Sequence, residues 1–139
     1  MAYSLRLSGI GKQDGKELFR MEPAWWEISE VRKLVTVNWV KTNETGSYSD
    51  EDADISLDVA RRLHEHFKPE ILEQIAFNVS CIESAEESPD EYHADYVASH
   101  AKYVAELKEE LHTIEAALGA DAGNFTHFHL CIFEWESGF

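Results

Sequence analysis

The chain has 139 residues, of which 27 are Asp or Glu and 12 are Lys or Arg, so its formal net charge is −15. This balance argues against direct binding to nucleic acid or to an anionic membrane, because both need clustered Lys and Arg. The length and the hydrophobic fraction of 44% are ordinary for one globular unit, and we predict a single domain over residues 1–139. A basic partner would be attracted over a long range.

The acidic residues are concentrated in the last two thirds of the chain. Residues 1–42 carry seven basic and five acidic residues, whereas residues 43–139 carry five basic and 22 acidic residues. The first 20 residues hold several charges and no apolar core of a signal peptide, and no segment approaches 18 apolar residues. We therefore expect a cytoplasmic protein without a membrane-spanning helix.

The first third of the chain predicts two strands. Residues 3–10 alternate apolar and polar side chains, which is typical of a half-buried strand, and residues 11–15 form a turn. Residues 34–40 are rich in β-branched and aromatic side chains and predict a second strand. Residues 17–32 show no clear pattern, and the polar residues 42–54 are expected to form an acidic loop.

Three helices are predicted in the middle of the chain. Ser56 is a good N-cap for a first helix, and Pro69 is expected to end that helix and begin the next. A long third helix runs to about Leu118, with Gly119 after its end. Its apolar seam, spaced three and four residues apart, is Val97, His100, Val104, Leu107, Leu111, Ile114 and Leu118.

The chain ends in a predicted strand over residues 124–136. Both faces of this strand are largely apolar, which indicates an interior position in a sheet. Because strands and helices are segregated along the chain, we predict an α+β fold rather than an alternating α/β fold. The expected architecture is a mixed or antiparallel sheet of about four strands, the N-terminal strands plus the C-terminal one, packed against three helices.

A metal site on the C-terminal strand is the sharpest catalytic candidate. His127 and His129 point to one face of that strand, with Cys131 next along, and His93 or His100 could add a ligand. Two histidines two apart on a strand also occur by chance, so packing or contact with a partner is favoured. Phosphate-binding, dinucleotide-binding and nucleophile motifs are absent from the sequence. We therefore expect no metal, no cofactor and no catalytic residue.

Two acidic stretches carry the functional prediction. One precedes the first predicted helix and has one tyrosine beside it, and the other precedes the long helix and has two. Protein interfaces combine aromatic anchors of this kind with complementary charge. Acidic residues near helix N-termini also stabilise the helix, which is a competing explanation. The candidate partner-binding residues are Tyr48, Asp50, Glu51, Asp52, Asp54, Glu83, Glu86, Glu87, Asp90, Glu91, Tyr92, Asp95 and Tyr96.

In size, acidity, lack of catalytic motifs and α+β character, the chain resembles the immunity proteins of bacterial toxin systems. The resemblance implies tight binding to a cognate toxin domain, often a basic nuclease, with surface carboxylates pairing with toxin Lys and Arg. A secretion-type chaperone is one alternative, and it would need an exposed apolar groove, for example one involving Trp25, Trp26 and the long helix. A small metal-dependent enzyme using His127 and His129 is the other.

Overall fold

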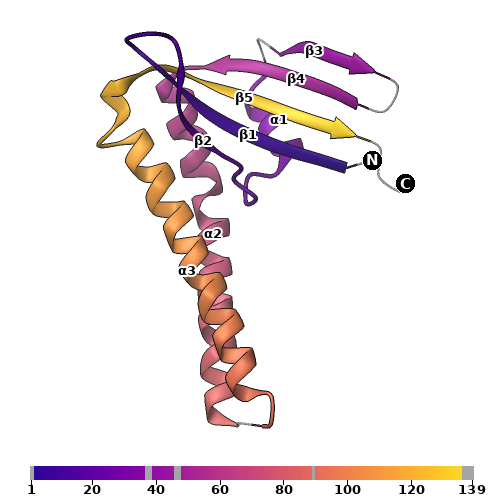
Figure 1. The fold of residues 1–139 in the computed structure, drawn as a ribbon, viewed down its shortest axis with the longest axis vertical. Helices are drawn as coiled ribbons and strands as arrows, with labels where there is room; N and C mark the ends of the chain where they lie inside the picture. The colour runs from indigo at the N-terminus through magenta and orange to yellow at the C-terminus, as the bar shows by residue number, and fades with distance from the viewer. Residues whose placement is uncertain (1, 37–38, 46–47, 89, 136–139) are drawn as a thin grey trace.

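A computed structural model describes residues 2–36, 39–45, 48–88 and 90–135. Its single sheet has five strands in the order β2-β1-β5-β4-β3, and every neighbouring pair is antiparallel. The predicted α+β fold is confirmed, with five strands in place of about four (Figure 1). The strands are β1 (Ala2–Gly11), β2 (Glu17–Met21), β3 (Val40–Thr45), β4 (Tyr48–Ile55) and β5 (Phe125–Trp135).

The C-terminal strand β5 lies in the centre of the sheet, as its apolar faces predicted. It pairs with β1 on one side and with β4 on the other. Phe128, Leu130 and Ile132 on one face of β5 are buried in the core, together with Leu5 and Leu7 of β1. The core cluster therefore takes its β5 and β1 side chains from one face of the sheet. The other face carries Asp52, Asp54, His127 and His129.

The predicted strand over residues 34–40 is wrong for most of its length. Leu34 ends helix α1 (Ile28–Leu34), and a strand begins only at Val40. The reason is that Val31 and Val35 are four residues apart and both buried, so a helical turn places them side by side against the core. Val37 and Asn38, in the middle of this predicted strand, lie outside the described residues.

The acidic loop expected over residues 42–54 is instead the hairpin of β3 and β4. Aspartate is rare in strands, which hid the period of two in β4. Ala53 and Ile55 of β4 are buried in the core, whereas Asp52 and Asp54 lie on the opposite face. Both carboxylates have a partner on the neighbouring strand, the imidazole of His129 in β5.

Helix α2 (Leu57–Glu87) is one continuous helix, although Pro69 was expected to divide it. Ser56 is its N-cap, as predicted, and accepts a hydrogen bond from the backbone N–H of Val59 at 3.2 Å. Proline inside a helix removes one backbone hydrogen bond and costs about 3 kcal/mol. Pro69 is exposed, so water can reach the freed carbonyl, and burial of Phe67 and Ile71 on either side holds the two segments in line.

Helices α2 and α3 (His93–Leu118) form a long antiparallel hairpin that projects away from the sheet (Figure 1). The long last helix and its end at Gly119 were predicted. A short 3-10 turn (Ala122–Asn124) leads from α3 into β5. In the part of the chain that the structure describes, no helix combines the length and apolar character needed to cross a membrane.

Candidate functional site

The two acidic stretches lie at opposite ends of the molecule. The first is on β4 in the sheet, and the second surrounds the turn between α2 and α3 (Figure 1). Helix α2 has 31 residues between them, which is about 46 Å at 1.5 Å per residue. The structure therefore does not join the predicted residues into one continuous negative face, and each stretch has to be examined separately.

The β4 aspartates are held by a histidine of the central strand. The Nε2 atom of His129 lies 2.7 Å from Asp52 Oδ1, and its Nδ1 atom lies 2.8 Å from Asp54 Oδ1. Burial lowers the pKa of His129, but the hydrogen bonds and charges of the two aspartates outweigh it and raise the pKa above its usual value. Protonated His129 donates to both carboxylates and neutralises part of their charge.

The other predicted residues of the first stretch are also engaged or covered. Asp50 is only 6% exposed. Glu51 points to the opposite face and pairs with Arg32 of α1 at 3.1 Å. The side chain of Tyr48 lies outside the described residues. This stretch is thus largely a structural element of the sheet, and few of its carboxylates are available to a partner.

The predicted metal-ligand candidates do not converge. His127 and His129 share a face of β5, and His127 Nε2 lies 3.6 Å from Asp54 Oδ1. His93 and His100 lie on the distal part of α3, away from that strand (Figure 1). Cys131 is buried, and burial and a hydrogen bond with Asp52 raise the pKa of its thiol to about 12. Among the described residues, no group of three or more His, Cys, Asp or Glu side chains could hold a metal ion.

The second stretch belongs to a segment that we call the distal arm, residues 69–101, which contains the far halves of α2 and α3. The arm has eight acidic residues and no Lys or Arg in its sequence. All six predicted carboxylates of this stretch are exposed, namely Glu83, Glu86, Glu87, Asp90, Glu91 and Asp95. Tyr92 is 67% exposed and Tyr96 is 43% exposed, so aromatic surface accompanies the charge.

The distal arm has little core of its own. Ile71 and Asn78 are buried, but none of the described residues from 79 to 101 is. Where the two helices meet in this region, His100 Nδ1 and Asn78 Oδ1 are 2.8 Å apart, so a polar pair occupies a seam position. Phe77 is 67% exposed on the outside of the same region. The arm therefore presents both unpaired charge and uncovered apolar surface.

The distal arm thus combines exposed carboxylates with exposed aromatic side chains. No protein-family model, no curated protein and no solved structure matches this chain. The function therefore has to be inferred from the residues and their arrangement.

Two side chains that the chaperone alternative needed on the surface are in the core. Trp25 and Trp26 are 3% and 2% exposed, and Trp26 stacks on Phe67 of α2 with ring centroids 5.7 Å apart. His64 of α2 is buried as well. Burial is the largest cause that lowers the pKa of His64, and Glu115 nearby opposes it. Trp26 thus packs against α2, whereas His64 lies next to Glu115 of α3.

Proposed function

We propose that this protein is a non-catalytic inhibitor that binds a basic protein domain through its distal arm. The proposed partner is a toxin domain, as in the immunity proteins that the sequence resembles. The observation that carries the proposal is the charge of the arm, eight carboxylates without a single Lys or Arg, on a hairpin that projects from the sheet. A field of this kind accelerates association with a positively charged partner.

Helix stability does not explain the carboxylates at the end of α2. Glu83, Glu86 and Glu87 lie in the last turns of α2, where the negative end of the helix dipole disfavours acidic side chains, and this end has no basic residue. The carboxylates at the start of α3, by contrast, have a local explanation. Asp90 accepts a hydrogen bond from the Tyr92 N–H at 2.8 Å, and Asp95 lies in the first turn of α3.

The exposed aromatic side chains supply the apolar part of the proposed interface. Tyr92, Tyr96 and Phe77 are the kind of anchors that carry most of the binding energy at protein interfaces. Burial against a partner would also complete the core that the arm lacks between residues 79 and 101. A second copy of this chain is a poor partner, because two arms would bring 16 carboxylates together without a cation.

The experiment begins with co-purification from the cells of origin, followed by mass spectrometry, and the expected partner is a strongly basic domain. Its association rate is then measured for a triple Glu→Gln variant of the arm and for a matched triple variant outside it. The arm variant changes Glu83, Glu86 and Glu87, and the control changes the exposed Glu65, Glu106 and Glu109.

We expect the arm variant to associate at least about tenfold more slowly at low salt, and the control to lose much less. Adding salt should slow the wild type toward the arm variant, because screening removes the same long-range attraction. Equal losses in the two variants, or a partner without net positive charge, would refute the arm as the binding surface. Protection of cells that express the partner domain tests the immunity function itself.

A further inference from the structure

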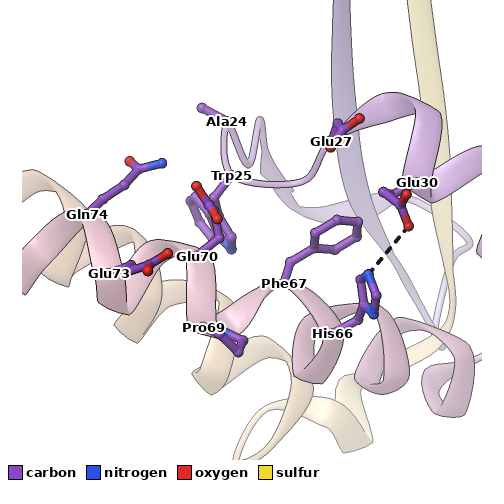
Figure 2. A pocket seen from close by; sticks show the side chains of 10 residues that line it. All are labelled: Ala24, Trp25, Glu27, Glu30, His66, Phe67, Pro69, Glu70, Glu73 and Gln74. Carbon is purple, nitrogen blue, oxygen red and sulfur yellow. Dashed lines mark ion pairs between the residues drawn. The ribbon is translucent and has the colours of Figure 1, made fainter.

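A cavity of about 490 Å³ opens where helix α1 and the loop before it meet α2, at the base of the distal arm (Figure 2). Trp25 and Phe67 give it aromatic walls, and glutamates lie on both sides of them. Glu27 and Glu30 come from the start of α1, and Glu70 and Glu73 come from α2. This volume is in the range of small-ligand sites, so the cavity can take a side chain or a small molecule.

The negative charge around the cavity favours a cationic ligand. Four of its ten lining residues are glutamates, and none of these ten is Lys or Arg. Two of the glutamates are partly engaged, since Glu30 lies 3.7 Å from His66 Nε2 and 3.4 Å from Lys33 Nζ, and Glu27 accepts a hydrogen bond from Ser29. Glu70 and Glu73 are exposed on the α2 side.

A second observation points to a ligand with a hydrogen-bond acceptor. The Trp25 residue is only 3% exposed, and its indole N–H has no acceptor in the described part of the chain. Figure 2 shows this indole among the lining residues, with its nitrogen turned toward Phe67 in this view. A buried donor without an acceptor costs about 1–3 kcal/mol, so an acceptor from a ligand would relieve it.

We propose that this cavity binds a guanidinium group on an apolar stem next to a carbonyl, which is the chemistry of an arginine residue in a peptide. The guanidinium pairs with Glu70 and Glu73, for which its planar fork is suited, and the stem packs on Trp25 and Phe67. The adjacent carbonyl accepts from the Trp25 N–H. This proposal rests on the proposed function in one respect, namely that the arginine would belong to the basic partner.

The cavity is tested by itself by titrating the full chain with acetyl-arginine-methylamide as the probe. Binding is monitored by NMR through the indole N–H resonances of the chain. We expect the Trp25 resonance to shift with a dissociation constant in the range of about 1 mM. The Trp39 resonance should not move, because its indole N–H already donates to the Val35 carbonyl at 2.6 Å. The matching lysine probe should bind more weakly, and the uncharged citrulline probe should not bind.

The double variant Glu70→Gln/Glu73→Gln should weaken binding of the arginine probe by at least about fivefold. Its control is Glu83→Gln/Glu86→Gln, which removes the same charge from the arm outside the cavity and should change binding less than twofold. All four residues are exposed, so both variants should fold normally. An unmoved Trp25 resonance, or equal binding of the citrulline probe, would overturn the cavity as a guanidinium site.

The outcome for the cavity is separable from the outcome for the arm. If the probe binds and the double variant weakens the partner complex more than the Glu83→Gln/Glu86→Gln control does, the arginine comes from the partner. If the probe binds and the complex is unaffected, the cavity takes a free guanidinium compound. If the arm variant associates with the partner as fast as the wild type does but the probe still binds, the proposed function is refuted. The cavity then remains a guanidinium site.

Discussion

The two ends of this molecule carry similar acidic sequences but use them differently. In the sheet, Asp52 and Asp54 are bound to His129, and Asp50 is covered. In the distal arm, Glu83, Glu86 and Glu87 are exposed beside the unfavourable end of a helix. The comparison shows that acidic composition alone does not identify a docking surface, because a carboxylate with a partner stabilises the fold and one without remains available.

The first prediction contrasts the cores of the two ends. Ile114 is fully buried near the sheet, whereas Ile82 is only half-buried in the arm. Ile114→Ala should lower the free energy of unfolding by about 2–5 kcal/mol, because it leaves a cavity in a packed core. Ile82→Ala should cost about 1 kcal/mol or less. Urea denaturation of both variants measures the difference, and equal losses would mean that the arm has a packed core after all.

The second prediction concerns the histidine clamp of the sheet. His129→Ala removes two hydrogen bonds and leaves Asp52 and Asp54 as neighbouring carboxylates without their shared donor. We expect a loss of about 1–3 kcal/mol in the free energy of unfolding. The same substitution at His66, an exposed residue of α2, is the control and should cost much less. If His129→Ala left the free energy of unfolding unchanged, the sheet carboxylates would not need the clamp for stability.

The third prediction is the pH dependence of that clamp. Because the pKa of His129 is raised in the folded protein, the stabilisation is complete below the ordinary pKa of histidine and is lost as pH rises through the folded pKa. The difference in unfolding free energy between wild type and His129→Ala should therefore shrink as pH rises above about 6.5. Taking the difference cancels other groups such as His64, and a difference that grows with pH would contradict the clamp.

The smallest effect is expected from the arm carboxylates themselves. Glu83→Gln/Glu86→Gln/Glu87→Gln should leave the free energy of unfolding unchanged or raise it by up to about 1 kcal/mol, since it removes repulsion and an unfavourable dipole interaction. Thermal and urea unfolding measure this change. A clear destabilisation would assign these residues to the fold and would weaken the case for a partner.

Much of the fold could be predicted from the residues. The strand at residues 3–10, the Ser56 cap, the long last helix and the interior C-terminal strand follow from local patterns. The hairpin of β3 and β4 does not follow from local patterns, because aspartates are typical of a loop. Their partner His129 is far away in the sequence and lies beside them only in the folded sheet. Pro69 was misleading for the same reason, since its cost is offset by the burial of Phe67 and Ile71. The cavity at Trp25 could not be predicted, as its glutamates come from two separate segments.

The sequence by itself determined the fold class, the net charge and the acidic residues that could meet a partner. Periodicity and composition are properties of the sequence itself, so they can be recognised without knowledge of the folded structure. Only the tertiary structure decided which carboxylates have a partner and which remain exposed. That outcome depends on contacts between residues far apart in the chain, such as His129 with Asp52 and Asp54.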